Sequence, residues 1–225
     1  MATDRLPSRV VLEFHVLGPL EVVGEGGALR LGGPRQRATL AILLLQGNRV
    51  VPVERLADEL YAGRPPVSAV TQVQRQISDL RRALGAADAI ETRPPGYVLH
   101  LGDDDFDLAR FERLTAMAER ARAREDVEAA AGLLREALDL WRGPPLADLA
   151  YESFARAAVE RLEELRLAAL EARIDADLVL GRHAAVLRSS RASSPSTRCA
   201  SASAASRCSR STAREGRPRR SRSTA

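Results

Sequence analysis

The 225-residue chain has no lysine, two cysteines and three histidines, and each scarcity excludes a class of function. Without lysine there is no phosphate-binding loop of the Walker type. Cys199 and Cys208 lie in a Ser/Arg-rich tail, where they indicate neither a disulfide framework nor a zinc site. His15, His100 and His183 are far apart and match no metal-binding motif. The sequence predicts no metal, no cofactor and no enzyme.

Long apolar runs and a secretory signal are also absent, so the sequence predicts a cytoplasmic protein with no membrane association. The composition, 45% hydrophobic and 28% charged, is typical of globular proteins. All 34 basic residues are arginine, whose codons are mostly GC-rich, and this indicates a GC-rich genome.

The formal charge of +4 is unevenly distributed. Residues 1–101 carry 12 arginines against 10 acidic residues, residues 102–187 carry 12 against 19, and residues 188–225 carry 10 against 1. The basic character therefore belongs to the tail and does not indicate that the folded part binds nucleic acid.

The first hundred residues alternate between short strand-like and helical patterns. Residues 14–33 predict a small antiparallel sheet with turns at Gly18-Pro19 and Gly26-Gly27. A helix is predicted to begin at Pro34, and because its apolar residues lie all around it, it should be buried at the centre of the domain. A brief extended piece at residues 50–51 and a second helix at 53–61 should follow.

A third helix is predicted between the prolines at 65–66 and Gly85, and its two faces differ in chemistry. The apolar face comprises Val70, Val73, Ile77, Leu80 and Leu84. The opposite face comprises Ser68, Thr71, Arg75, Ser78 and Arg82, with Gln72 and Asp79 on its flank. Arginine can pair with guanine and glutamine with adenine, while hydroxyl groups reach phosphates. An ordinary solvated helix face is the alternative interpretation of this composition.

Residues 90–93 and 97–101 predict a β-hairpin around the turn Pro94-Pro95-Gly96. Strands, three helices and a hairpin, in this order, form a winged helix-turn-helix. The run from Phe14 to Leu101 resembles the OmpR-type DNA-binding domain. The motifs LGGPRQRATLAILLL, QRQISDLRRALG and IETRPPGYVLHL resemble the Streptomyces antibiotic regulatory protein (SARP) family in particular.

This resemblance implies that the third helix enters the major groove of double-stranded promoter DNA and that the hairpin, or wing, touches the adjacent backbone or minor groove. The DNA contacts that it implicates are Ser68, Thr71, Gln72, Arg75, Ser78 and Arg82 on the helix, and Arg93 and Tyr97 at the wing. A core aromatic is an equally good interpretation of Tyr97. Arg35 and Arg37, beside the N-terminus of the first helix, are further candidates for phosphate contact. Asp79 is expected to tune specificity or to pair with a neighbouring arginine.

A helical domain is predicted after the hairpin, with helices at residues 108–124, 127–141 and 153–179 and a fourth from His183. Aspartates 103–105 are expected to cap the first of these helices, and a cation site is the less favoured alternative. Trp141 ends an apolar stripe and is predicted to be a core anchor. Antiparallel helix pairs of this kind are typical of tetratricopeptide-like arrays.

The segments FDLARFERL, LLREALDLWRGPPLADL and RLEELRLAALEARIDADLVLGRH resemble the bacterial transcriptional activator domain of the same family. The resemblance implies an activator of a biosynthetic gene cluster that forms a homodimer and contacts RNA polymerase. The predicted fold is mostly α with a small β component: a winged helix-turn-helix at 10–102, then a tetratricopeptide-like helical domain at 103–187. A helical adaptor whose winged helix does not bind DNA is the alternative.

Residues 188–225 consist largely of Ser, Arg, Ala and Thr and lack apolar periodicity. One interpretation is a disordered basic tail. The other is a frameshift near Leu187, because shifting GC-rich codons by one frame gives a helix-periodic continuation of the activator domain. A frameshifted, non-functional remnant is therefore a further hypothesis, and resequencing the DNA around codon 187 tests it.

Overall fold

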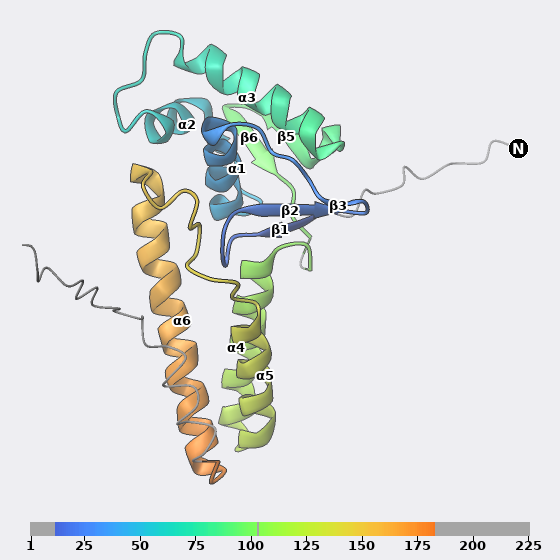
Figure 1. Cartoon of the computed structure of the whole chain (residues 1–225), viewed down its shortest axis with the longest axis vertical. Coiled ribbons are helices and arrows are strands. Elements are labelled where there is room, and N and C mark those ends of the chain that lie inside the picture. The colour runs from blue at the N-terminus through green and yellow to red at the C-terminus, as the bar shows by residue number, and fades with distance from the viewer. Residues whose placement is uncertain (1–11, 103, 183–225) are drawn as a thin grey trace, which may run out of the picture.

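The computed structural model describes residues 12–102 and 104–182, which contain two three-stranded sheets and six α-helices. The sheets and helices α1 to α3 gather at one end of the molecule, and α4 to α6 extend from it as a helical stalk (Figure 1). The predicted fold class, a mostly helical protein in which a winged helix precedes a helical domain, is confirmed. None of the helices in these ranges has the length and apolar character of a membrane span.

The first sheet is antiparallel, with its strands in the order β1-β2-β3, and it confirms the strands expected from the sequence. The strands are β1 (Glu13–His15), β2 (Glu21–Gly24) and β3 (Gly27–Ala28). Phe14 lies opposite Val22, and both are buried. Gly27 has φ +99°, which side-chain-bearing residues rarely adopt, so the tight turn before β3 requires glycine there.

Helix α1 (Pro34–Gln46) is the buried centre of this part of the molecule, as predicted. Proline occupies its first turn, where the missing N–H costs no hydrogen bond. Seven consecutive residues, 38–44, are buried, and this is possible only because protein packs around the whole helix. Both sheets and helices α2 and α3 surround it (Figure 1).

Helices α2 (Val53–Leu60) and α3 (Ala69–Leu84) complete the three-helix unit. The buried face of α3 comprises Ala69, Val73, Ile77, Leu80 and Leu84. The placement of Val70 on this face is therefore wrong, because 43% of Val70 is exposed and Ala69 is buried in its place. Both residues lie at the edges of the apolar stripe, and tertiary packing rather than periodicity decides between them.

The second sheet has its strands in the order β4-β6-β5. Strands β5 (Ile90–Arg93) and β6 (Gly96–Leu99) form the predicted hairpin, and β4 (Val51–Pro52) pairs with β6. A Cβ atom on Gly96 would lie 1.8 Å from the Val51 carbonyl oxygen, so only glycine permits this pairing. A short 3₁₀ turn, η1 (Ala87–Ala89), connects α3 to β5.

The helical part contains α4 (Asp107–Ala123), α5 (Val127–Asp139) and α6 (Ser153–Val179), close to the predicted ranges. The α4–α5 pair is antiparallel, and α6 runs beside it (Figure 1). Trp141 contacts Phe111 edge to face with ring centroids 5.5 Å apart, which confirms its role as a core anchor. The expected fourth helix from His183 and the tail lie outside the described residues.

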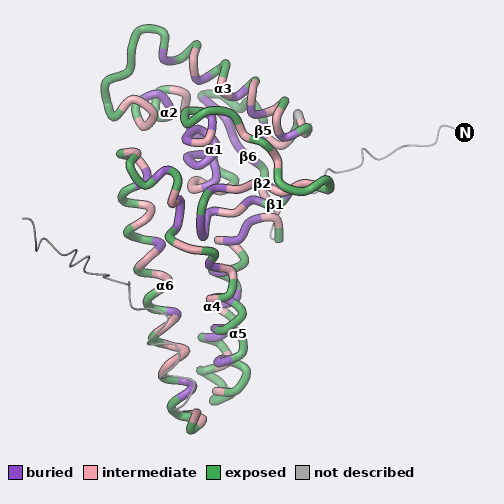
Figure 2. Tube along the Cα trace, in the orientation of Figure 1, coloured by how far each residue is buried: buried purple, intermediate pink, exposed green. Residues whose placement is uncertain are grey.

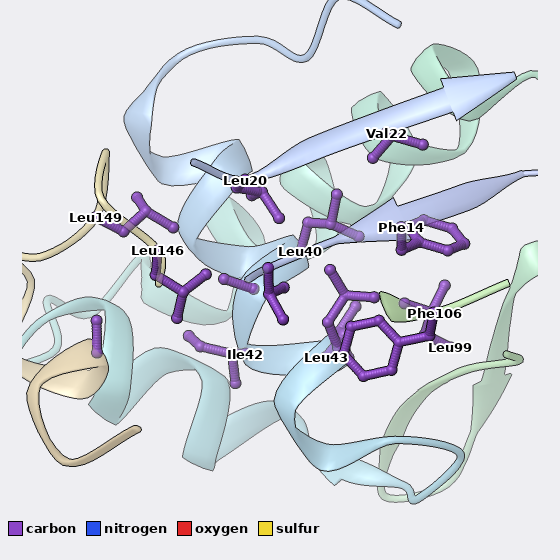
Figure 3. Packing of buried hydrophobic residues seen from close by; sticks show 14 of the residues in the cluster. Phe14, Leu20, Val22, Leu40, Ile42, Leu43, Leu99, Phe106, Leu146 and Leu149 are labelled. Atoms are coloured by element: carbon purple, nitrogen blue, oxygen red, sulfur yellow. The ribbon is translucent and has the colours of Figure 1, made fainter. Parts of the chain in front are cut away.

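A single hydrophobic core runs through both parts of the molecule. Figure 3 shows Leu146 and Leu149, from the segment between α5 and α6, packed near Leu20 and Leu40 of the winged-helix part. Figure 2 shows buried positions continuing from the upper elements into the helices. The domain boundary near residue 102 stays a prediction, but the two parts share one interior.

Candidate DNA interface

The outward face of α3 is a polar arc with few internal partners. Thr71, Arg75, Ser78 and Arg82 are exposed, in agreement with their expected positions. Gln74 and Val70 are exposed beside them, although the sequence patterns did not identify either as a site residue. The opposite face of α3 packs against α1 and α2, so the interior fixes the direction in which the polar arc points.

A hydrogen-bond network at the N-terminal end of α3 brings together three of the predicted residues. The Arg35 guanidinium donates to Gln72 Oε1 at 2.8 Å and to the Tyr61 hydroxyl at 3.1 Å. Gln72 Nε2 donates to Ser68 Oγ at 2.9 Å. Arg35 also lies over the Tyr61 ring, 4.8 Å from its centroid. Tyr61 was not predicted, because nothing in its local sequence indicates a partner eleven residues away.

Near the other end of α3, Arg82 forms an ion pair with Asp79 one turn earlier. This confirms the pairing alternative for Asp79. The Arg82 side chain is 78% exposed. Water screens an exposed ion pair, so this one contributes little to stability. A phosphate or a base edge could therefore take over the guanidinium at small cost.

The wing places its two predicted residues differently. Arg93 is exposed at the end of β5, next to the turn of the hairpin. Tyr97 is only 7% exposed and belongs to the core, so the core interpretation holds and Tyr97 is removed from the candidate contacts.

Arg81, which was not predicted, joins the wing to α3. Its guanidinium donates to the Ile90 carbonyl oxygen at 2.7 and 2.9 Å and to the Thr92 hydroxyl at 2.8 Å. It also lies 6.0 Å from the centroid of the Tyr97 ring. Arg81 thus sets the distance between the two elements that the family resemblance assigns to DNA.

Arg37 was expected to contact a DNA phosphate, but its guanidinium is bonded within the protein. Its Nε donates to Asp148 Oδ2 at 2.7 Å, and its Nη2 bonds to the carbonyl oxygen of Leu20. Asp148 belongs to the segment between α5 and α6, so this arginine joins the two parts of the molecule. Arg37 is therefore removed from the candidate phosphate contacts. Sequence position beside a helix N-terminus could not reveal a carboxylate 111 residues away.

The turn between β1 and β2, residues 16–20, is held by the helical part. Asp107 accepts hydrogen bonds from the N–H groups of Val16 and Leu17, each at 2.9 Å. Asp148 accepts from the Leu20 N–H at 2.7 Å. In the other direction, the Arg142 N–H donates to the Leu17 carbonyl oxygen at 2.8 Å. These contacts fix the winged helix relative to α4.

The expectation that the aspartates cap α4 is wrong for Asp104 and Asp105, because the N-cap residue is Phe106 and none of the described side chains caps the helix. Asp104 pairs with Arg113, and the Asp105 carboxylate accepts a hydrogen bond from the Gly102 N–H at 3.2 Å. Within residues 12–102 and 104–182, no group of three or more His, Cys, Asp or Glu side chains is arranged to hold a metal ion.

Comparison with known proteins gives the same two-part organisation. A family model described as the bacterial transcriptional activator domain matches residues 106–196. The chain is 39% identical over 186 residues to the regulatory protein DnrI of Streptomyces peucetius, covering 78% of this chain and 68% of DnrI. It is 40% identical over 174 residues to the regulatory protein AfsR of Streptomyces coelicolor, covering 77% of this chain and 17% of AfsR.

A solved structure, Mycobacterium tuberculosis EmbR in complex with a low-affinity phosphopeptide, superimposes with a TM-score of 0.77 at 34% identity. That match covers 81% of this chain and 50% of the EmbR chain. The chain thus spans about two thirds of DnrI but only half or less of the other two relatives. Because the match to DnrI is long enough to include both the winged helix and the helical part, the chain belongs to the SARP family of DNA-binding transcriptional activators.

Proposed function

We propose that this chain binds promoter DNA by inserting α3 into the major groove while Arg93 at the wing contacts the adjacent backbone. The exposed arc of α3 carries the proposal, because it presents hydroxyls and two arginines on a helix whose other face is fixed in the core. On this arc we assign Ser68, Thr71, Gln72, Arg75, Ser78 and Arg82 to DNA contact. Arg35, which donates a hydrogen bond to Gln72, is assigned to contact a nearby DNA phosphate.

The orientation of the wing supports this assignment. Arg81 ties β5 to the last turns of α3, so Arg93 and the recognition arc are parts of one rigid surface. A rigid surface loses less conformational entropy on binding than two independent elements would. We therefore expect the backbone of the proposed surface to keep its shape on DNA, with only side chains such as Arg82 exchanging partners.

The helical part is proposed to serve protein contacts. Residues 102–187 carry 12 arginines against 19 acidic residues, and this negative charge opposes direct DNA contact by α4 to α6. We assign to this part the contact with RNA polymerase and a homodimer on repeated half-sites. The protein then acts in the cytoplasm on the nucleoid, as an activator of a biosynthetic gene cluster and without enzymatic activity.

Fluorescence anisotropy tests the DNA assignment. It measures binding of the full chain, across a salt series, to the duplex upstream of the gene that encodes it. Wild type should bind saturably, with an affinity that falls steeply with salt. Arg75→Ala and Arg82→Ala should each weaken binding by about 1–3 kcal/mol if they reach base edges. Arg156→Ala, which removes an exposed arginine from α6, is the matched control and should bind as wild type does.

Deleting residues 188–225 separates the winged helix from the basic tail. If specific binding survives the deletion, α3 and the wing are responsible for it. If only non-specific binding occurs and the deletion abolishes it, the tail was responsible, and the proposed interface is wrong.

Sedimentation of the DNA complex on duplexes with one or two half-sites tests the homodimer. Two copies per two-site duplex, bound cooperatively, are expected.

A supershift of this complex by purified bacterial RNA polymerase tests the polymerase contact. Failure of the supershift with an intact DNA complex would refute the polymerase contact alone.

A further inference from the structure

Two exposed residues of α3, Val70 and Gln74, have no role in the fold that explains them. Val70 is 43% exposed on the first turn of the helix, while its neighbour Ala69 fills the core. A valine that leaves much of its apolar surface in water gains little from burial there. Gln74 is also exposed, and its side chain has no hydrogen-bond partner within the described part of the chain.

The helix places these two side chains together. They are four residues apart, so they lie one turn apart on the same side of α3. Ser78, one turn further along, bonds to the backbone carbonyl oxygen of Gln74 and leaves the Gln74 amide free. No acidic residue occurs in the first turn of α3, so nothing on that turn repels DNA.

The contrast with Gln72 indicates which amide is available to a base. The Gln72 oxygen accepts from both Arg35 and Tyr61, and its nitrogen donates to Ser68. Both ends of the Gln72 amide are therefore already bonded, so the DNA contact assigned to Gln72 requires the exchange of one of these bonds. The Gln74 amide presents a donor and an acceptor side by side, with no internal bond to break.

An A·T pair offers the matching chemistry in the major groove. Adenine presents N7 as acceptor and N6–H₂ as donor, and a glutamine amide pairs with both. Thymine presents a C5-methyl group, which an apolar side chain contacts and which cytosine lacks. We infer that Gln74 reads an adenine and that Val70 contacts a thymine methyl at the same or an adjacent base pair, so that these residues determine part of the DNA specificity. This inference rests on the proposed function.

Modified duplexes test the two contacts separately. The full chain first selects its preferred sequence from a randomised duplex library. Affinities are then measured on that sequence with single thymines replaced by uracil, which removes only the methyl group. In a second series, single adenines are replaced by 7-deazaadenine, which removes the N7 acceptor.

Wild type should lose affinity by about fourfold for uracil at one position, the effect of one buried methyl group. Val70→Ala should bind the thymine and uracil duplexes equally. Wild type should lose roughly fivefold or more for 7-deazaadenine at one position, and Gln74→Ala should lose this discrimination there and keep it elsewhere. Leu167→Ala, which truncates an exposed leucine of α6, is the matched control and should keep every wild-type preference.

Two outcomes would overturn the inference while the proposed function stands. In one, both variants keep all wild-type preferences; in the other, they weaken binding to every duplex equally. If the library yields no preferred sequence for the wild type, the proposed function fails together with the inference. Circular dichroism of both variants establishes that they are folded, and both positions are exposed, so loss of fold is not expected.

Discussion

The turn at residues 16–20 and the exposed arc of α3 both belong to the winged helix, but the turn is largely buried and the arc faces solvent. In the turn, the N–H groups of Val16, Leu17 and Leu20 all meet carboxylates from the helical part. On the arc, Thr71, Gln74 and Arg75 are exposed to solvent. A buried backbone group needs a hydrogen-bond partner inside the protein. An exposed polar side chain is hydrated instead and stays available to bind a ligand.

Arginine shows the same contrast. Arg37 and Arg81 are bonded within the protein, to Asp148 and to the wing, and hold elements together. Arg75 is exposed on α3, and Arg82 has only an exposed partner. The bonded arginines position the surface and the exposed ones are available to a ligand, so substitutions in the two groups should separate stability from DNA affinity.

The largest effect is expected from Asp107→Ala. This change leaves the buried N–H groups of Val16 and Leu17 without acceptors, and it should lower the free energy of unfolding by about 3 kcal/mol. Urea denaturation followed by circular dichroism measures the loss. Asp175→Ala on the exposed side of α6 is the matched control, with an expected change within about 0.5 kcal/mol. Equal stability of the two variants would show that Asp107 does not hold the turn.

Arg81→Ala should have the next largest effect, and it should lower both the stability of the fold and the affinity for DNA. It removes the bonds to Ile90 and Thr92, and the free energy of unfolding should fall by about 1.5 kcal/mol. DNA affinity should also fall, because the wing is no longer fixed relative to α3. Arg82→Ala should weaken DNA binding while changing stability by less than about 1 kcal/mol. Unchanged DNA affinity in Arg81→Ala would mean that the wing position does not depend on this arginine.

The elements themselves were predictable because their signals are local. Pro34 and Gly47 bound α1, and the periodicity from Val73 to Leu84 defines the buried side of α3. These patterns depend on residues a few positions apart, and the predicted ranges of α4 to α6 follow for the same reason.

The partners of individual side chains were not predictable in this way. Arg37 and Asp148 are 111 residues apart, and Asp107 meets a turn 90 residues before it. Arg35 and Arg37 had the same expected role, phosphate contact, and only the fold distinguishes them. Gln72 was among the residues expected to contact DNA, but the feature that distinguishes it, its contacts with Tyr61 and Arg35, is tertiary.

Arg37→Ala and Arg93→Ala sharpen the contrast at a smaller scale. Arg37→Ala should lower the free energy of unfolding by about 1 kcal/mol and leave the salt dependence of DNA binding unchanged. Arg93→Ala should leave stability unchanged and reduce the slope of log affinity against log salt by about 1, the loss of one phosphate contact. The two variants need only one salt titration and one urea titration each. A reduced salt slope in Arg37→Ala would return this arginine to the DNA interface.

The smallest effect on stability is expected from the exposed ion pair between Asp104, which precedes α4, and Arg113 within α4. The hydrogen bond and positive charge of Arg113, with a smaller contribution from Arg110, hold the pKa of Asp104 below its ordinary value of 3.8. Because the folded-state pKa is lowered, the contribution of Asp104 to stability is present at neutral pH and is lost as the pH falls through the lowered pKa. Carboxyl NMR titration should show this pKa rising toward 3.8 in Arg113→Gln and, by screening, at high salt. Since Asp104 is fully exposed, urea denaturation of Arg113→Gln should differ little from wild type at neutral pH, in contrast to Asp107→Ala. A large loss of stability in Arg113→Gln would contradict the small effect expected for an exposed ion pair.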